Sequence, residues 1–281
     1  MIFLSAEKWQ ADMGDNSGQA GINVQNNVLV KKCIHFVEYA GGLTLLLLRT
    51  IGWIFVPPLK RKQLVEQMSK NGVDSFSIVF LTAFFTGIVL ALQTAYTMKQ
   101  MSAEIYIASL VSVSLTRELG PVLTALVVAA RVGASITAEL GTMNVTEQID
   151  ALETLATNPV KYLVVPRFLA LTVMLPLLTV YADFIGILGG FLVGFSKLHI
   201  APHLYIKKTF DALAMKDIYT GMIKALVFAA IIAIVACYEG MRTKGGAEGV
   251  GRSTTLSVVI SCILVITFDC LFTALFYFVL R

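Results

Sequence analysis

The stretch "FSIVFLTAFFTGIVLALQTAYTM" (76–98) contains no charged residue and decides the fold class. About 20 apolar residues in an α-helix cross the hydrocarbon core of a bilayer, which is ~30 Å thick. Four more runs are similarly apolar, at 105–138, 163–194, 218–238 and 256–280. None alternates between apolar and polar residues as the strands of a transmembrane barrel do. The sequence therefore predicts an all-α polytopic membrane protein with five transmembrane helices.

The composition agrees with this class and excludes several functions. The chain of 281 residues is 57% hydrophobic and 14% charged, whereas soluble domains have about 25% charged residues. The four cysteines form no CxxC pair, which argues against a metal site or a disulfide framework. The glycine-rich "KGGAEGVG" (244–251) lacks the Lys-Ser/Thr ending of a phosphate-binding loop. We expect no catalytic residue, metal, cofactor or nucleic-acid partner, and no enzymatic activity of the chain itself.

The N-terminal region gives two further expectations. Residues 1–30 are polar and rich in Gly and Asn, without the pattern of a cleavable signal, and predict a disordered tail. The segment "IHFVEYAGGLTLLLLRTIGWIFVPP" (34–58) is apolar enough to span, but Glu38, Arg49 and a glycine pair interrupt it. A helix that lies flat on the membrane would place Arg49 among the headgroups. Both arrangements remain open at this point.

Lys and Arg in the loops predict the orientation. If 76–98 runs outward from the cytoplasm, the cytoplasmic side receives the basic N-terminal region, Lys161 and the basic loop within 240–255. The outer side receives fewer Lys and Arg residues, most of them in the 196–217 loop. The loop between the second and third spans then faces the cytoplasm.

Charged residues at membrane depth are functional candidates because burying them is costly. Arg117 and Glu118 are adjacent, so they do not face each other on a helix and have different partners. One could hold a polar headgroup while the other pairs with a second helix, or both could form structural salt bridges. Arg131 and Glu139 lie eight residues apart on one face, which favours a structural pair.

Asp183, Lys224 and Asp269 are charges on three different spans, and the first of these spans also carries a glycine pattern. Lys224 could bridge to either Asp183 or Asp269. Scattered single charges are a weak basis for a proton relay. Gly186, Gly190 and Gly194 follow each other at four-residue steps, which lets two helix backbones approach closely, either inside one subunit or at a dimer seam.

The loop segment "ELGTMNVTEQIDALETLATNP" (139–159) is acidic and amphipathic. Asn144 with Glu147 three residues on predicts a capped helix start, and Asn158–Pro159 predicts its end. The acids Glu147, Asp150 and Glu153 lie on one face and an apolar stripe on another. Anionic headgroups would repel this face. The segment fits docking to a soluble partner, or an ordinary connecting helix with a solvated face.

These residues resemble a known family. "SLTRELGPVLTALVVAARVGASITAELGTMNVTEQIDALETLATNPVKYLVVPRFLA" (114–170) is similar to the core of the MlaE-type permeases, the membrane subunits of ABC transporters that move lipids. The likeness continues through "LPLLTVYADFIGILGG" (175–190), the segment 223–255 and "FDCLFTAL" (268–275). It implies one permease domain over 31–281, with an interfacial elbow region at 31–72 and a coupling helix at 139–156.

The resemblance also implies partners and site residues. It implies a homodimer, a cytoplasmic ABC ATPase that receives the coupling helix, and a periplasmic MCE-domain protein that passes the lipid on. The implied lipid pocket is lined by Leu90, Met101, Arg117 and Glu118; family members often have an aromatic residue where Met101 stands. The implied ATPase interface comprises Glu139, Gly141, Met143, Glu147 and Asp150. We expect structural roles for four charged residues within the membrane, namely Arg131, Asp183, Lys224 and Asp269.

The function that we expect is that of the permease subunit of an ABC transporter for phospholipid or a related lipid. It would sit as a multi-pass protein in a bacterial inner membrane, exchange lipid with the periplasmic carrier and so serve outer-membrane lipid asymmetry. The alternative is an ion-coupled secondary transporter of a hydrophobic substrate, which predicts inverted repeats and acids that work within the membrane.

Overall fold

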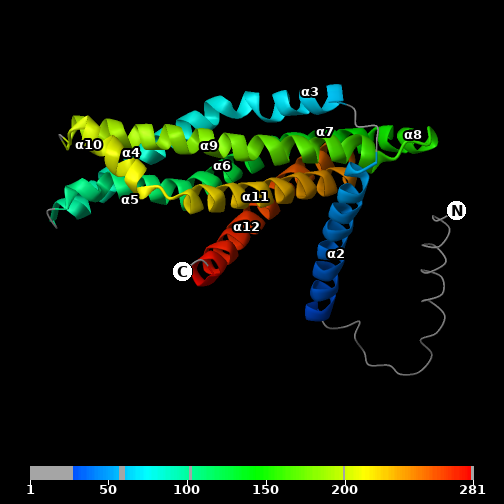
Figure 1. Cartoon of the computed structure of the whole chain (residues 1–281). Coiled ribbons are helices and arrows are strands. Elements are labelled where there is room, and N and C mark those ends of the chain that lie inside the picture. The colour runs from blue at the N-terminus through cyan, green and yellow to red at the C-terminus, as the bar shows by residue number, and fades with distance from the viewer. Residues whose placement is uncertain (1–27, 57–60, 101–102, 199, 280–281) are drawn as a thin grey trace. The chain divides into compact units, whose positions relative to one another are not determined.

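The computed structural model describes residues 28–56, 61–100, 103–198 and 200–279, and these residues form helices without a strand (Figure 1). The chain divides into two compact units, Met1–Thr44 and Leu45–Arg281. The fold of the second unit is described below. Most of the predicted tail and Met101 lie outside the described residues, but α2 begins at Val28, inside the segment predicted as disordered.

Five helical stretches in the described part of the chain are long and apolar enough to cross a membrane, as the sequence predicted. They include, in chain order, α4 (Phe76–Gln100), α5 to α7 (Ile107–Val145), α9 (Val165–Ser196), α11 (Met215–Met241) and α12 (Gly246–Val279). The helix α2 (Val28–Ile54) is not among them. Whether it lies in the interface stays a prediction.

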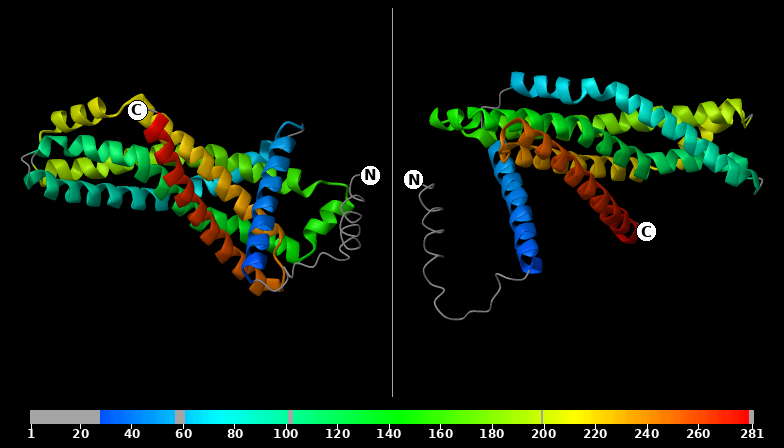
Figure 2. Two further views of the ribbon diagram at one scale, coloured as in Figure 1. Left: turned by 90° about the horizontal axis from the view of Figure 1, so that it is seen from below. Right: turned by 180° about the vertical axis from the view of Figure 1, so that it is seen from behind.

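The spans differ in how far the rest of the unit covers them. In the span that contains α9, 72% of the most apolar window is buried, compared with 11% in α12. α9 packs against α4 and α11, and α11 in turn contacts α7 and α12, so α9 and α11 form the centre of the unit (Figures 1 and 2). The uncovered surface of α12 is available to lipid or to another chain.

Close helix packing uses the predicted glycine pattern inside one chain. A Cβ on Gly87 of α4 would collide with the backbone of Gly186 of α9, so the two helices approach through these glycines. A Cβ on Gly194 would lie 2.7 Å from the ring of Tyr205, which belongs to α10 (Pro202–Ala212). The stripe therefore packs against α4 and α10 of the same subunit, which is the first of the two arrangements left open by the sequence.

The second span contains two π-helical turns rather than a simple proline kink. η4 (Leu115–Leu119) precedes α6 (Gly120–Val128), which starts with Pro121 in its first turn, and η5 (Ala129–Gly133) follows it. Each π turn accommodates one extra residue and is frequent at functional sites. The first turn carries Arg117 and Glu118 and the second carries Arg131, which are candidate residues from the sequence.

A polar helix precedes the first span. α3 (Arg61–Asn71) is followed by the single 3-10 turn η2 (Val73–Ser75), and α4 starts directly afterwards. α3 packs against α9. Residues 34–54 of the predicted 34–58 segment lie in the single helix α2, which ends at Ile54, and α3 is a separate helix that begins after this segment.

Candidate functional site

The loop between the second and third spans does not form one helix over 139–156. α7 (Ala134–Val145) continues the second span to Val145, and a separate α8 covers Gln148–Thr154. Glu147 breaks the two apart with a left-handed φ of 59°. The prediction of a single helix capped by Asn144 is wrong, because Asn144 is still inside α7 and its side-chain amide donates to the carbonyl of Thr243 at 2.9 Å.

Asn158 does mark a boundary, but of the next helix. Its Oδ1 accepts hydrogen bonds from the backbone N–H groups of Val160 and Lys161. These donors open η6 (Val160–Val164), which leads into α9. The side chain therefore satisfies donors at the start of the third span.

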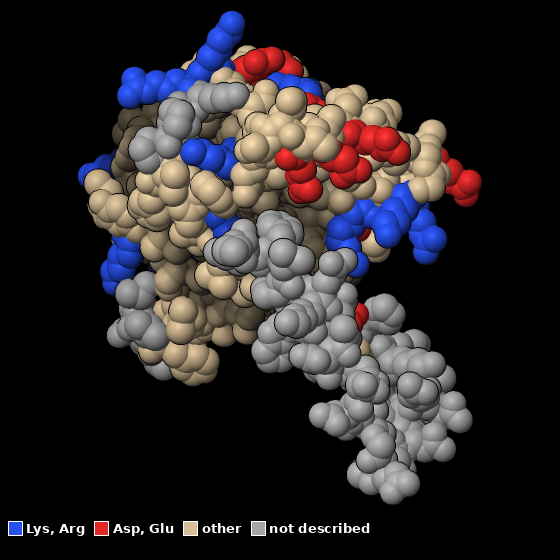
Figure 3. Space-filling view, turned by 90° about the vertical axis from the view of Figure 1, so that its right-hand side faces the viewer, with Lys and Arg blue, Asp and Glu red and all other residues tan. Residues whose placement is uncertain are grey.

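α8 presents its acids to solvent. Glu147, Asp150 and Glu153 are exposed, while Ile149 on the other side of the helix is 5% exposed. Leu155, at the end of α8, is 74% exposed. Figure 3 looks onto the end of the second unit at which α8 lies and shows acidic side chains gathered there, close to basic ones. The predicted two-faced character of the segment is present in α8.

The remaining predicted interface residues take different positions. Gly141 is buried, and a Cβ there would meet the hydroxyl of Thr243 at 2.9 Å. Met143 is half-buried. Together with the Asn144 hydrogen bond, this close approach holds the end of α7 against the α11–α12 connection.

Glu139 is held by cations within the chain. Its carboxylate lies 2.7 Å from Nη2 of Arg167 on α9 and 2.9 Å from Nζ of Lys70 on α3. The expected pair with Arg131 is therefore wrong. Arg131 instead donates from Nη1 to the hydroxyl of Ser75 at 2.8 Å. Helical spacing placed the two residues on one face, but π turn η5 and the cations of neighbouring helices decide the partners.

Arg117 and Glu118 have separate partners, as their adjacency predicted. Nε of Arg117 donates to Oδ1 of Asp217 at 2.5 Å, and Oε2 of Glu118 accepts from Nζ of Lys224, also at 2.5 Å. The side chain of Arg117 is 53% exposed, so its guanidinium is still accessible. Both residues belong to η4.

Lys224 is the centre of an ion cluster between three spans. Its side chain is 1% exposed, and its ammonium also donates to Asp269 and Thr273 of α12, each at 2.8 Å. The predicted bridge from Lys224 to an aspartate is thus present, and Asp269 is its partner. Two carboxylates on one ammonium balance the desolvation of the buried charge.

Asp183 is not part of that cluster. It faces Gly120, where a Cβ would collide with Oδ1 of the aspartate. This Oδ1 is buried and has no hydrogen-bond partner among the described residues. Close contact with Gly120 positions α9 against α6.

Leu90 lines an open groove of about 340 Å³ next to η4. The groove is bounded by α4 and by Leu119, which directly follows Glu118 in the chain. Its full lining is Phe85, Thr86, Val89, Leu90, Gln93 and Leu119. The structure therefore brings Leu90 close to the segment that carries Arg117 and Glu118, in an apolar groove.

Sequence reasoning missed several residues that organise these sites. Arg167 is 2% exposed and lies within an apolar run, which is a detectable signal. Asp217 directly precedes the predicted span 218–238, in a polar loop, and nothing in the sequence pattern indicated that it pairs with a charge on another helix. It pairs with Arg117, and its Oδ2 accepts from the N–H of Ala214 at 3.1 Å, which caps α11.

Comparison with known proteins identifies the family. The sequence model described as Permease MlaE matches residues 64–275. The chain belongs to the MlaE permease family. A probable ABC transporter permease protein of Rickettsia felis is 46% identical over 91% of this chain and 98% of its own length. Proteins with the same description from Synechocystis and Porphyra purpurea are 44% and 40% identical, over 74% and 72% of this chain and 79% and 76% of their own lengths.

Membership in this family and the five spans make the chain a multi-pass ABC transporter permease. The match begins within α3 and ends within α12, so it covers the ion cluster, the groove at Leu90 and the acidic α8. The description of the family as ABC transporter permeases implies an ATPase partner.

Proposed function

We propose that this MlaE permease is the membrane subunit of an ABC transporter that moves phospholipid or a related lipid between the bacterial inner membrane and a periplasmic MCE-domain carrier. It works as a homodimer, and a separate cytoplasmic ATPase supplies the energy. The chain itself is not an enzyme. Serving the lipid asymmetry of the outer membrane is the corresponding physiological role.

The observation that carries the proposal is the exposed acidic surface of α8. Glu147, Asp150 and Glu153 point away from the unit, while Ile149 is buried in it. α8 also follows directly on α7, whose end is fixed to Thr243. A partner that pushes on α8 therefore moves the second span and the α11–α12 connection together.

The polar and apolar groups near η4 suit a lipid. The open groove at Leu90 offers apolar walls for an acyl chain, and the half-exposed Arg117 offers a guanidinium that binds phosphate oxygens well. Rearrangement of the second span would change the groove and the position of Arg117 at once. Movement of α7, which is part of the second span, would therefore expel the lipid from the groove.

The decisive experiment replaces two acids of α8. We expect Glu147→Lys combined with Asp150→Lys to reduce co-purification of the ATPase subunit with the tagged permease, because both changes reverse charge on the contact surface. Asp211→Lys, an exposed charge reversal on α10, is the matched control and should retain the ATPase. Undiminished co-purification of the double variant would refute docking through α8.

A second experiment addresses the substrate. Arg117→Ala should lower lipid transport by the reconstituted complex while the complex still assembles, and Arg117→Lys should retain part of the activity. Mass spectrometry of lipid co-purified with the complex identifies the lipid class. Transport that follows a proton gradient and ignores ATP would favour an ion-coupled secondary transporter instead.

A further inference from the structure

Arg131 is a cation without an anionic partner in the described part of the chain. It lies in η5 and is exposed, and among the described residues its side chain donates a hydrogen bond only to the neutral hydroxyl of Ser75. No ion pair among the described residues includes Arg131. Its positive charge is therefore available to a ligand.

The position of Ser75 gives the depth of this cation. α3, just before it, is polar and carries Arg61, Lys62 and Lys70, whereas α4 starts with Phe76 and is apolar throughout. The change from polar to apolar helix at Ser75 is where the headgroup region meets the hydrocarbon. Arg131 thus reaches the interfacial level on the basic side of the protein.

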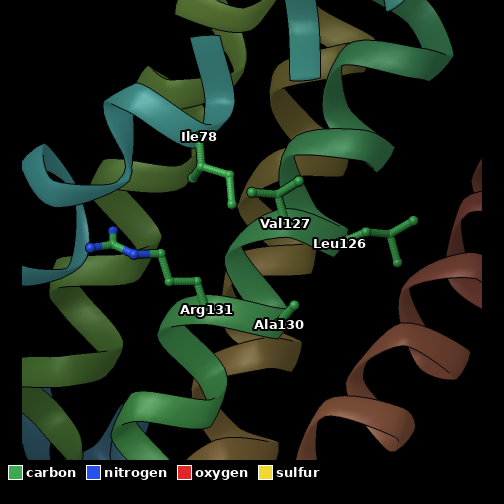
Figure 4. Close-up of a pocket in the computed structure, with 5 residues that line it drawn as sticks. All are labelled: Ile78, Leu126, Val127, Ala130 and Arg131. Atoms are coloured by element: carbon green, nitrogen blue, oxygen red, sulfur yellow. The ribbon is translucent and has the colours of Figure 1, made fainter. Parts of the chain in front are cut away.

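Arg131 also lines an apolar groove of about 410 Å³. Its other walls are Ile78 of α4 and Leu126, Val127 and Ala130 of the second span. Figure 4 shows Ile78 and Val127 pointing toward each other across it, while the Arg131 side chain extends toward the start of α4. A cation at one end and apolar walls at the other match a molecule with an anionic head and an apolar tail.

The groove lies on the seam between α4 and the second span. One turn further along both helices, a small cavity is lined by Thr82, Thr86, Leu119 and Leu123 among others. Thr86 and Leu119 also line the groove at Leu90. Both the Arg131 groove and the groove at Leu90 therefore lie along the seam between the same two helices.

We propose that the Arg131 groove binds a phospholipid of the cytoplasmic leaflet, with its phosphate on Arg131 and an acyl chain along Ile78, Leu126 and Val127. The guanidinium donates charge-assisted hydrogen bonds to phosphate oxygens, and the acyl chain covers the exposed apolar walls. The wide π turn η5 directs Arg131 toward Ser75 and the interface. This site is distinct from the groove at Leu90 and needs neither ATP nor transport to be occupied.

The test uses the purified full-length chain in phosphatidylcholine nanodiscs that contain phosphatidylglycerol with a photoreactive acyl chain. After illumination, mass spectrometry locates the lipid adducts. We expect adducts on the peptides that contain Ile78 and Leu126. Arg131→Gln should lower their yield about tenfold, as the loss of a charged hydrogen bond predicts, and Arg131→Lys should keep most of it.

Two further variants make the result specific. Ala130→Trp fills the groove while Arg131 stays in place, and it should also lower the yield of adducts. Arg252→Gln removes an exposed charge on α12 that the groove does not include, and it should change nothing. Gel filtration confirms that each variant is folded; if Arg131→Gln aggregates, the Lys and Trp variants decide the question.

Two outcomes would overturn the proposal. Adducts in the groove that are indifferent to both Arg131→Gln and Ala130→Trp would mean ordinary lipid contact without a site. Cross-links between two copies of the chain through Leu126, in place of lipid adducts, would mean that a second subunit covers the seam. Neither outcome affects the ATPase experiment above, so the two proposals can fail independently.

Discussion

The carboxylate of Glu139 lies 2.7 Å from Nη2 of Arg167, and so neutralises a guanidinium whose side chain is only 3% exposed. This pair joins α7 to α9, and Lys70 extends it to α3. The helix that leads to α8 is therefore tied to the helix before the first span and to the third span. A displacement of α8 would therefore be passed through α7 to α3 and α9.

Replacing Glu139 should destabilise the isolated permease. Glu139→Gln leaves the buried Arg167 charge without its counter-ion, and we expect a loss of roughly 3 kcal/mol, the lower end for a broken buried pair because the Glu139 side chain is 35% exposed. Chemical denaturation in detergent measures it. Lys70→Gln removes only the exposed pair and should cost less than about 1 kcal/mol. Equal effects of the two variants would contradict this assignment.

Removing Lys224 should also be costly, and the loss should be repairable. Lys224→Met leaves Glu118 and Asp269 facing each other without a cation, which predicts a loss of roughly 3 kcal/mol in unfolding free energy. Adding Glu118→Gln and Asp269→Asn removes the uncompensated charges and should restore most of the stability. Thermal unfolding of the three proteins in one detergent tests this. A triple variant no better than the single one would show that packing, not charge, dominates the cluster.

The end of α8 offers a stabilising substitution. Ala156 has a φ of 56°, a left-handed conformation that costs a non-glycine residue about 1 kcal/mol or more and costs glycine nothing comparable. Ala156→Gly should therefore raise the unfolding midpoint. Ala151→Gly, at an exposed position inside α8, is the matched control and should lower it because glycine weakens a helix interior. The opposite order would mean that the left-handed turn is not populated.

Tyr205 should make stability fall in alkaline solution. Burial raises the pKa of its phenol to about 12. The folded protein keeps the phenol neutral while the unfolded chain ionises it from about pH 10. The contribution of the neutral phenol to the free energy of unfolding is thus complete below pH ~10, and it is lost as the pH rises toward the pKa of the folded state. Comparing Tyr205→Phe with the parent from about pH 8 to about pH 11 should show a smaller alkaline loss in the variant.

The same variant should be tolerated at neutral pH. The Tyr205 hydroxyl is buried and has no hydrogen-bond partner among the described residues, while its ring packs on Phe191 at 5.5 Å between centroids. Phenylalanine keeps the ring and removes the unsatisfied oxygen, so Tyr205→Phe should be at least as stable as the parent. A clear loss of stability near pH 7 would point to a partner for the hydroxyl.

The sequence correctly predicted those structural features that depend on a single segment of the chain. Five apolar runs gave five spans, because length and hydropathy alone decide whether a helix can cross a membrane. The adjacency of Arg117 and Glu118 correctly predicted different partners. The acids of α8 were placed on an exposed face by helical spacing alone.

The same rules failed where several segments compete. Glu139 and Arg131 share a helix face, yet Glu139 pairs with cations from α3 and α9 and Arg131 turns to Ser75. Asn144 has the sequence context of a cap, yet the second span continues through it, because its amide binds Thr243 from the α11–α12 connection. Contacts from distant parts of the chain overrode the local preference in each case.

The sequence by itself determined the number of spans, the all-α class and the presence of one acidic amphipathic segment, because these follow from composition and periodicity. Only the tertiary structure decided which charges meet. Lys224 lies among Glu118, Asp269 and Thr273, and Arg131 has no anionic partner among the residues that the structure describes. Ion pairing depends on which helices lie side by side and on how the π turns rotate them, and no single segment contains that information.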